Sequence, residues 1–218
     1  MRLFRNRSEA GRRLAAQLSE FAGRTDVIVL ALPKGGVPVA AEVSSALGAP
    51  LDVLVVRKIG VPWQPEFAVG AIASGGMMVL DTETMNELGL TRASLDPILV
   101  AEQRELMRRE SLYRGGRPFP TLEGQVVIVV DDGLATGATM QAAVAALRTR
   151  GPALVVVAVP VASRSACAML DRVVDRVVCV ATPEPFYGVG VWYDDFDQTT
   201  DEEVLSLLAH GEVPLAAR

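Results

Sequence analysis

Five apolar runs of strand length divide the chain, and amphipathic segments lie between most of them. The runs are rich in Val, Ile and Leu and lack strict polar alternation, which is typical of strands buried on both faces of a parallel sheet. They are Val27–Leu32, Leu51–Val56, Val126–Val130, Leu154–Val159 and Arg176–Val180. The pattern therefore predicts a buried sheet at the centre of the molecule.

Apolar residues recur at helical spacing around these strands. The expected helices are Ser8–Phe21, Val37–Leu47, Thr139–Arg150 and Ser163–Val174. Strands that alternate with helices predict an α/β fold with a doubly wound, mainly parallel five-stranded sheet. With the strands numbered along the chain, right-handed crossovers on both faces give the spatial order 2-1-3-4-5. Ligands bind such sheets where the order reverses, here between strands one and three.

Residues 59–124 are too many for a simple crossover, so this section contains elements of its own. Its apolar pattern predicts a small hairpin and a helix, at Ala68–Ala73, Met77–Leu80 and Leu95–Leu112. Ahead of the hairpin, Gly60–Glu66 places Trp63 between two prolines. An exposed Trp in such a segment favours a lid over a packed structural loop.

We expect one domain over residues 1–218, because 218 residues with 50% hydrophobic composition bury one substantial core. Its expected parts are a core at about residues 25–181, a lid and hairpin insertion at about 59–80, and a small C-terminal hood at about 182–197.

The strongest candidate for chemistry follows the third apolar run. Asp131 and Asp132 end this run, and a loop of small residues and threonines comes next: Gly133, Leu134, Ala135, Thr136, Gly137, Ala138 and Thr139. Small residues let backbone N–H groups approach an anion, and the N-terminus of the following helix adds unpaired donors. The two carboxylates suit the vicinal hydroxyls of a sugar or a divalent cation. The sequence therefore predicts a site for a phosphorylated sugar.

Other anion-binding loops fit this sequence less well. A Walker loop needs Lys after its last Gly, and Ala138 stands there. The dinucleotide fingerprint is absent, and the Gly188–Gly190 segment runs into Val191–Tyr193 rather than into a helix. A simple capped turn remains an alternative, but it does not need two carboxylates and two threonines around small residues.

The segment Val127–Thr139 resembles the phosphoribosyl pyrophosphate (PRPP) signature of the type I phosphoribosyltransferases. The similarity extends to Leu32–Gly36 after the first strand and Val55–Lys58 after the second. It covers roughly Asp26–Ala181 in element order. Purine-salvage members often carry an acidic residue in the loop where this chain has Ala135. A general base from that position is therefore not available.

The resemblance implies that an acceptor nitrogen, expected to belong to a nucleobase, displaces pyrophosphate from PRPP with the help of Mg²⁺. It assigns PRPP binding to Lys34, Gly35, Gly36, Arg57, Asp131, Asp132, Ala135, Thr136, Gly137, Ala138 and Thr139. Catalytic stabilisation of the leaving group falls to Lys34, Arg57 and Lys58, at the ends of neighbouring strands. Asp131 and Asp132 are the expected metal ligands, and Phe186 and Trp192 of the hood are the expected acceptor-binding residues.

Charge and hydropathy limit the partners. A net charge of −5 disfavours nucleic acid and anionic membranes, both of which select a basic surface. The start of the sequence lacks the apolar stretch of a secretory signal, and the apolar run Ala153–Ala162 is far shorter than the ~20 residues that cross a bilayer. We expect a cytoplasmic protein, and the family resemblance adds a homodimer as an expectation.

Two termini of opposite charge complete the picture. Residues 1–24 contain six arginines and two glutamates, whereas residues 194–203 contain six acids and no base. Solvated surface segments are the favoured interpretation, and contact between the two ends is the alternative. Cys167 and Cys179 are expected to be buried as small apolar residues, outside any disulfide or zinc site.

Three functions fit the candidate loop. The favoured one is a PRPP-dependent transferase, because basic residues for pyrophosphate are present at Lys34, Arg57 and Lys58. A non-catalytic PRPP- or nucleotide-sensing regulator of the same fold is the alternative, although no helix-turn-helix or basic arm is evident. A hydrolase with Asp131 as nucleophile is third, because an activating base is missing beside it.

Overall fold

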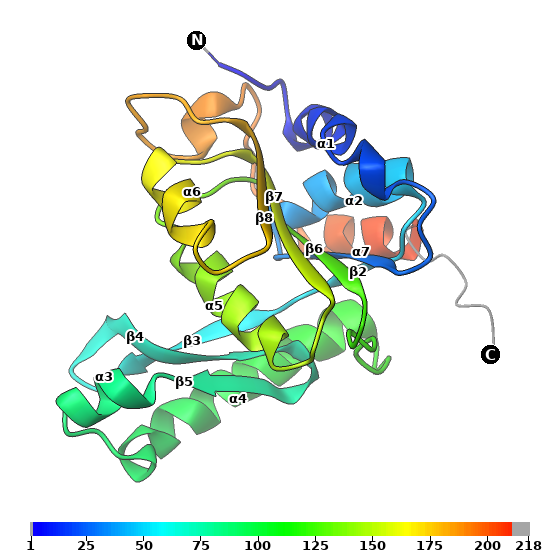
Figure 1. Cartoon of the computed structure of the whole chain (residues 1–218). Coiled ribbons are helices and arrows are strands. Elements are labelled where there is room, and N and C mark those ends of the chain that lie inside the picture. The colour runs from blue at the N-terminus through cyan, green and yellow to red at the C-terminus, as the bar shows by residue number, and fades with distance from the viewer. Residues whose placement is uncertain (1, 211–218) are drawn as a thin grey trace.

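The computed structural model describes residues 2–210, so residue 1 and residues 211–218 of the expected domain lie outside the described part. A five-stranded parallel sheet with the order β2-β1-β6-β7-β8 forms its centre (Figure 1). The strands are β1 Val27–Ala31, β2 Leu51–Val53, β6 Val126–Val130, β7 Leu154–Val161 and β8 Arg176–Ala181. This order confirms the predicted 2-1-3-4-5 arrangement.

Helices cover both faces of this sheet because successive side chains point to opposite faces. In β1, Val27 and Val29 pack in the cluster that includes α1 and α2, whereas Ile28 and Leu30 pack in the cluster that includes α5 and α6. The covering helices are α1 Arg7–Ala16, α2 Gly36–Leu47, α5 Ala138–Arg148 and α6 Arg164–Leu170. They lie close to the predicted positions, and the short helix η1, Ser19–Phe21, follows α1.

A second, antiparallel sheet occupies the lower part of the molecule in Figure 1. It contains β3 Val56–Val61, β4 Gln64–Ala73 and β5 Met77–Leu80, joined between β4 and β5 by the short helix η2, Ser74–Gly76. The predicted hairpin is therefore present, with an additional strand beside it. Helix α4, Arg92–Arg114, packs against this sheet, and α3, Thr82–Glu87, precedes it.

The predicted second strand, Leu51–Val56, is wrong at its carboxyl end. Strand β2 stops at Val53, and the chain passes to the antiparallel sheet. The hydrogen bonds explain the division, because Leu54 still donates to the Ala31 carbonyl whereas Val55 exchanges two bonds with Ser74. Apolar composition continues across this point, so the run conceals a change of sheet.

The predicted lid is a tight strand-turn-strand connection. Val61 pairs with Gln64, which leaves Pro62 and Trp63 as the turn between β3 and β4. The Trp63 side chain is 63% exposed. A large apolar side chain in solvent at a turn fits the lid hypothesis, and closure over a ligand stays a prediction.

Residues 182–197, the expected hood, follow β8 and include the short helix η3, Gly190–Trp192. The N-terminal segment is joined to it, because Phe4 and Tyr193 form a parallel bridge and Asp194 N–H donates to the Phe4 carbonyl at 2.8 Å. The oppositely charged ends also meet, since the Arg2 guanidinium donates to the Asp194 carbonyl at 2.9 Å. This contact supports the alternative interpretation of the charged ends.

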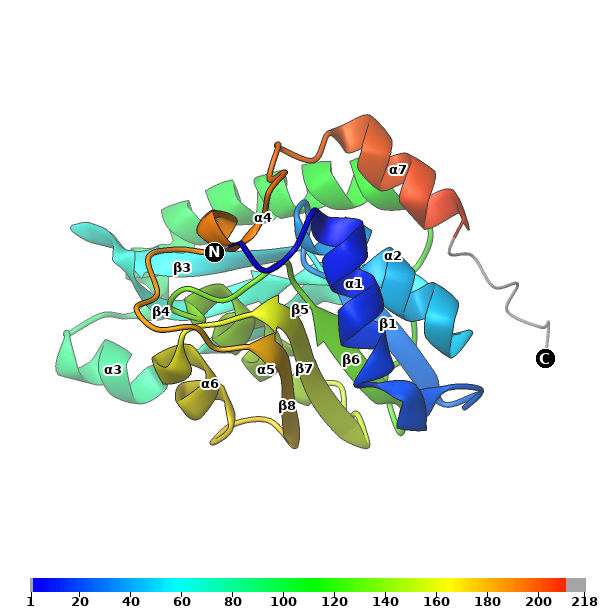
Figure 2. The same cartoon turned by 90° about the horizontal axis from the view of Figure 1, so that it is seen from above.

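Helix α7, Asp201–His210, was not predicted from the sequence and lies beside α2 and α4 (Figure 2). Across the described residues, none of the helices combines the length and apolar character that a membrane crossing requires. The single-domain boundary stays a prediction.

Candidate functional site

The loop that follows β6 leaves backbone donors unused. Leu134 is fixed to β7 by its bridge to Ala162, and the Ser163 hydroxyl donates to the Ala135 carbonyl at 2.6 Å. Within the described chain, the N–H groups of residues 135–137 make no hydrogen bond to another residue. Gly137 then begins α5 with φ 76°, a left-handed conformation that favours glycine. The loop thus presents free donors next to a helix N-terminus.

A second loop with free donors follows β1. Strands β1 and β6 are neighbours, and Ala31 pairs with Val130, so the loops after them start side by side. A Cβ on Gly35 would lie 2.1 Å from Asp132 Oδ2, so only glycine permits this close approach. The N–H groups of residues 34 and 35 make no hydrogen bond to another described residue. The sequence placed these two loops across one crevice, and their proximity agrees with it.

The two carboxylates lie between these loops, at the end of β6. Asp131 Oδ1 accepts from the Asp132 backbone N–H at 2.9 Å, and Asp132 Oδ2 accepts from Arg7 Nε at 2.8 Å. The other oxygens, Asp131 Oδ2 and Asp132 Oδ1, have no hydrogen-bond partner among the described residues. Two acceptors from adjacent residues therefore remain for a ligand.

Burial dominates the electrostatics of this pair. Desolvation raises the pKa of Asp131 well above its usual value, and the neighbouring charge of Asp132 raises it further. Desolvation also raises the pKa of Asp132, although the hydrogen bond and charge of Arg7 oppose this rise. Arg7 is the cation that compensates both carboxylates.

Tyr193 of the hood contacts the backbone beside the two carboxylates Asp131 and Asp132 (the acid pair). Its hydroxyl donates to the Asp132 backbone carbonyl at 2.6 Å, and the side chain is buried. Burial raises the pKa of the Tyr193 phenol, and the Asp132 charge adds to this effect. The phenol is therefore a neutral donor that fixes the backbone at the end of β6.

Among the predicted catalytic residues, Lys34 lies in the loop after β1, next to the loop that follows β6. Its Nζ lies 3.1 Å from Asp201 Oδ1 at the start of α7, and the Tyr113 hydroxyl donates to the same carboxylate oxygen at 2.6 Å. These two hydrogen bonds, Tyr113 first, lower the pKa of Asp201. Burial raises the pKa of Tyr113 to about 12. Lys34 is held at the rim by an ion pair that is about one-third exposed.

The sequence indicated that Arg57 and Lys58 lie at the end of a parallel strand, but they do not. Both belong to β3, where consecutive side chains point to opposite faces. Arg57 shares the face of buried Ile59 and its Nε lies 2.5 Å from Glu102 Oε2 of α4. The structure therefore brings neither side chain into contact with the acid pair, and their role in catalysis stays a prediction.

Phe186 and Trp192 lie together in the hood. Their ring centroids are 6.4 Å apart, and both pack against the small cluster that contains Phe4 and Tyr193. The buried indole N–H of Trp192 has no hydrogen-bond partner among residues 2–210. Phe186 also lines a hollow of about 800 Å³ together with Ser163, whose hydroxyl donates to the Ala135 carbonyl. The packing explains both aromatics in part, and the acceptor role stays a prediction.

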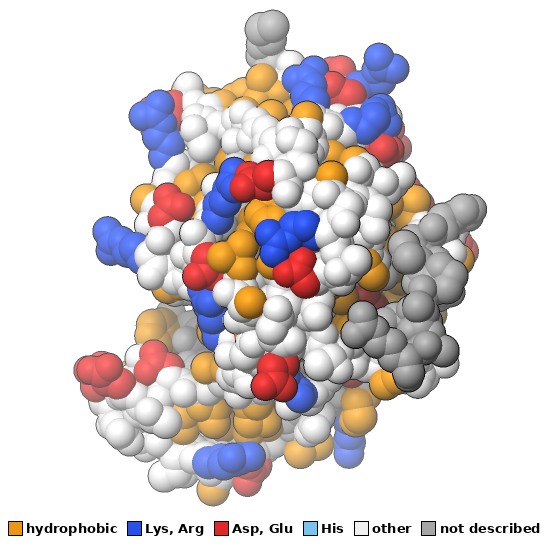
Figure 3. Space-filling model, turned by 45° about the vertical axis from the view of Figure 1, so that its right-hand side comes forward, with side chains coloured by type: hydrophobic (Ala, Val, Ile, Leu, Met, Phe, Trp, Pro, Cys, Tyr) orange, Lys and Arg blue, Asp and Glu red, His pale blue; other side chains and the backbone are white. Residues whose placement is uncertain are grey.

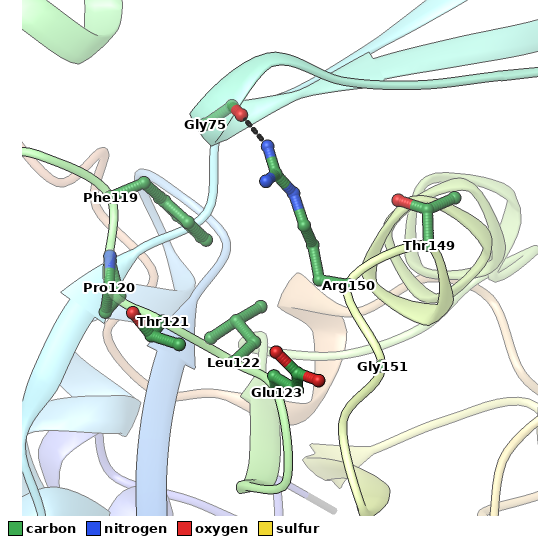
Figure 4. A pocket seen from close by; sticks show the side chains of 9 residues that line it. All are labelled: Gly75, Phe119, Pro120, Thr121, Leu122, Glu123, Thr149, Arg150 and Gly151. Carbon is green, nitrogen blue, oxygen red and sulfur yellow. Dashed lines mark hydrogen bonds between the residues drawn. The ribbon is translucent and has the colours of Figure 1, made fainter.

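A hollow of about 660 Å³ lies at the opposite edge of the sheet, before β6 and β7 (Figure 4). Its lining residues are Gly75, Phe119, Pro120, Thr121, Leu122, Glu123, Thr149, Arg150 and Gly151. The Arg150 side chain reaches across it to the Gly75 carbonyl. This hollow shares no lining residue with the predicted site.

Charges of both signs are interspersed on the face seen in Figure 3, with apolar side chains between them. That face therefore presents no continuous basic patch of the kind that binds nucleic acid. The described residues also contain no group of three or more His, Cys, Asp or Glu side chains that could hold a metal ion.

Sequence reasoning did not identify three contributors to this site, namely Arg7, Tyr193 and Ser163. Arg7 contacts an aspartate 125 positions away. Its only sequence signal is the basic N-terminal segment, which on its own favours a solvated surface. Tyr193 stands among the hood aromatics, but its hydrogen bond to residue 132 depends on tertiary structure.

Comparison with known proteins agrees with this geometry. The family model described as "Phosphoribosyl transferase domain" matches residues 3–194. Two Mycobacterium tuberculosis proteins named "Putative phosphoribosyl transferase", from strains CDC 1551 / Oshkosh and ATCC 25618 / H37Rv, are each 47% identical over 208 residues. These residues are 95% of this chain and 47% of each relative, so the chain spans about half the length of the curated relatives that it matches.

The crystal structure of TT1426 from Thermus thermophilus is similar over almost the whole chain. It is 42% identical with a TM-score of 0.87, and the match covers 96% of this chain and 99% of that one. The fold and the predicted family resemblance are both confirmed by these similarities. This chain belongs to the phosphoribosyl transferase domain family.

Proposed function

We propose that this chain transfers the 5-phosphoribosyl group of PRPP to a nitrogen of a small acceptor, a nucleobase in the simplest case, and releases pyrophosphate. The observation that carries the proposal is the set of backbone N–H groups at residues 135–137 that have no partner among the described residues, beside the two carboxylates that follow β6. Free amides bind an anion, and free carboxylate oxygens bind hydroxyls. A phosphorylated ribose carries both groups.

The loop after β6, residues 133–139 (the phosphate loop), would bind the 5-phosphate. Residues 135–139 supply the amides, and the hydroxyls of Thr136 and Thr139 are exposed there. The α5 N-terminus adds its positive dipole end. The N–H of Ala138 points to the Thr136 hydroxyl at 3.4 Å, a long contact that a phosphate oxygen can replace.

Asp131 and Asp132 would hold the vicinal ribose hydroxyls through their unpaired oxygens. With the phosphate and the diol fixed, the anomeric carbon has one orientation toward the acceptor. The acceptor nitrogen forms a bond to this carbon while the bond to pyrophosphate breaks, and pyrophosphate departs with the electron pair. Because Ala135 offers no base, the proton of the acceptor would pass to the departing pyrophosphate or to water.

Charge grows on pyrophosphate as it leaves, so cations and amides near the Lys34 loop would stabilise it. The Lys34 ammonium and the free N–H groups of residues 34 and 35 fit this role. Arg57 and Lys58, at the start of β3, would add further positive charge, although Arg57 is paired with Glu102.

Mg²⁺ fits this site only as an ion shared with the substrate. Two carboxylates are too few for a protein-only site, whereas Mg²⁺ is commonly bound by one or two carboxylates together with substrate phosphates. Asp131 and Asp132 would be those carboxylates, with Asp132 Oδ2 already bound to Arg7. When bound, the ion would neutralise charge on the leaving pyrophosphate.

The acceptor would lie under the hood, against Phe186 and the unpaired indole N–H of Trp192. A planar heteroaromatic acceptor offers a face for stacking and lone pairs for that donor. The turn at Pro62 and Trp63 would exclude water during the reaction. A homodimer is proposed by analogy with the family, and a cytoplasmic location is proposed from the sequence.

A pyrophosphate-release assay tests the proposal. The chain is mixed with PRPP and Mg²⁺ and with each member of a panel of purines, pyrimidines and pyridine carboxylates. Release with one class of acceptor is the expected result. Thr136→Val should abolish PRPP binding, because it removes a donor from the phosphate loop. Thr121→Val, at the opposite edge of the sheet, is the matched control and should behave as the wild type.

Two results would change the conclusion. Tight PRPP binding without pyrophosphate release for any acceptor would favour the regulatory alternative, in which the same loop senses PRPP or a nucleotide. Absence of PRPP binding by the folded chain would reject both functions.

A further inference from the structure

Arg7 links three parts of the chain at the acid pair. Its Nε donates to Asp132 Oδ2 at 2.8 Å, and one of its terminal nitrogens donates to the Asp197 carbonyl at 2.7 Å. Its guanidinium carbon lies 3.9 Å from the centroid of the Phe196 ring. The side chains of Arg7 and Asp132 are only 12% and 15% exposed. An arginine with a carboxylate, a carbonyl and a ring as partners has little rotational freedom.

The backbone on both sides of Arg7 is also fixed. Asn6 caps α1 by accepting from the Glu9 N–H, and Asp195 N–H donates to the Arg5 carbonyl at 2.9 Å. The first residue of α1 and the end of the hood therefore form one unit. This unit holds a single oxygen of Asp132 and leaves Oδ1 without a partner among the described residues.

The packing around Asp132 determines which of its two carboxylate oxygens a ligand can reach. Gly35 approaches the same oxygen, since a Cβ there would lie 2.1 Å from Oδ2 and 3.4 Å from Arg7 Nε. Oδ2 is thus enclosed by Arg7 and the Lys34 loop, and a ligand hydroxyl can reach only Oδ1. The N-terminal segment, through Arg7, therefore sets the orientation of the Asp132 carboxylate, and the phosphate loop does not.

We propose that Arg7 is a positioning residue for ribose recognition: it holds Asp132 so that Oδ1 accepts the 2-hydroxyl of the bound sugar. This inference rests on the proposed function. It assigns to the N-terminal segment a part in selecting ribose over deoxyribose, because a sugar without the 2-hydroxyl makes one fewer bond to the acid pair. Arg7 acts through Asp132 and does not itself touch the reacting atoms.

Direct binding tests this role without any acceptor. Isothermal titration calorimetry compares ribose 5-phosphate with 2-deoxyribose 5-phosphate in the wild type and in Arg7→Gln. The wild type should prefer the ribose compound. Arg7→Gln should weaken the binding of ribose 5-phosphate about ten- to a hundredfold, the scale of one charge-assisted hydrogen bond. The affinity for 2-deoxyribose 5-phosphate should stay almost unchanged. The preference between the two sugars should collapse.

Two further variants separate positioning from folding. Arg7→Lys keeps the charge but loses the planar fork, so it should restore only part of the preference. Arg12→Gln removes another α1 arginine, one that pairs with Glu42 at the surface, and should leave both affinities unchanged. If Arg7→Gln fails to fold by circular dichroism, Arg7→Lys alone decides.

The inference is overturned if Arg7→Gln, or Arg7→Lys in its place, keeps the wild-type preference or weakens both sugar phosphates equally. Failure of the proposed function gives a different result. In that case the wild type itself binds neither sugar phosphate nor PRPP.

Discussion

The two edges of the parallel sheet differ in what surrounds their backbone donors. At the carboxyl edge, the N–H groups of residues 34–35 and 135–137 make no hydrogen bond to another described residue. At the amino edge, Gly124 N–H donates to the Gly151 carbonyl and Gln125 N–H to the Leu122 carbonyl, but the N–H groups of residues 121–123 also make no hydrogen bond to another described residue. Hollows lie at both edges, one of about 660 Å³ at the amino edge and one of about 800 Å³ beside Ser163 and Phe186 at the carboxyl edge.

The carboxyl edge is distinguished by a combination, namely unused donors beside the N-terminus of α5 and two adjacent carboxylates, and neither unused donors nor empty volume alone indicates the ligand site. Ala135 and Thr136 are exposed, so solvent can serve their N–H groups until a ligand replaces it. The amino-edge hollow contains one guanidinium, and it is already bound to the Gly75 carbonyl. The carboxyl edge also collects cations, carboxylates and a phenol from segments far apart in the chain.

The largest expected effect comes from the acid pair. Asp132→Asn replaces an acceptor oxygen by a donor group and removes the ionic partner of Arg7. We expect turnover with PRPP to fall about a hundredfold or more, the scale of a misplaced reacting group. Steady-state kinetics measures it. Asp171→Asn, an exposed position after α6, is the control, and equal activity of the two variants would contradict the assignment.

Removal of Lys34 should have the next largest effect. Lys34→Ala deletes the cation of the carboxyl-edge loop that faces the proposed pyrophosphate position. We expect turnover to fall about ten- to a hundredfold, somewhat below the loss of an oxyanion-hole donor, because the ammonium is partly exposed. Inhibition by pyrophosphate should weaken in parallel. Unchanged inhibition would remove Lys34 from the leaving-group site.

The amino edge should respond in stability and not in binding. Arg150→Ala removes the hydrogen bond between the Arg150 guanidinium and the Gly75 carbonyl. The free energy of unfolding should fall by about 1 kcal/mol, the net value of one hydrogen bond. Urea denaturation measures this change, and calorimetry should show an unchanged PRPP affinity. A clear loss of PRPP affinity would show that the two edges are coupled.

The smallest effect concerns pH. Tyr113 and Lys34 lower the pKa of Asp201 below its usual 3.8, so the folded state favours the carboxylate. This contribution is present above the unfolded-state pKa and is lost as the pH falls through the folded-state pKa. Asp201→Asn should therefore lose less thermal stability on acidification than the wild type. Glu202→Gln, its exposed neighbour on α7, should follow the wild-type curve, and three identical curves would reject this role for Asp201.

The sequence by itself determined the parallel sheet and the loop at its centre. Both depend on patterns within a few residues: a run such as Val126–Val130 has the composition of a buried strand, and small residues after it have few other uses. The order of the strands followed from general rules of connection, and residues 131–139 carried enough local chemistry to indicate a sugar phosphate.

Only the tertiary structure decided which side chains serve that loop. The division of Leu51–Val56 between two sheets depends on hydrogen bonds exchanged between Val55 and Ser74, and α7 was not recognised at all. The contact of Arg7 with Asp132 joins residues 125 positions apart, and no local pattern specifies it. Side-chain contacts between distant segments arise when packed elements bring them together, so periodicity along the chain carries no signal for them.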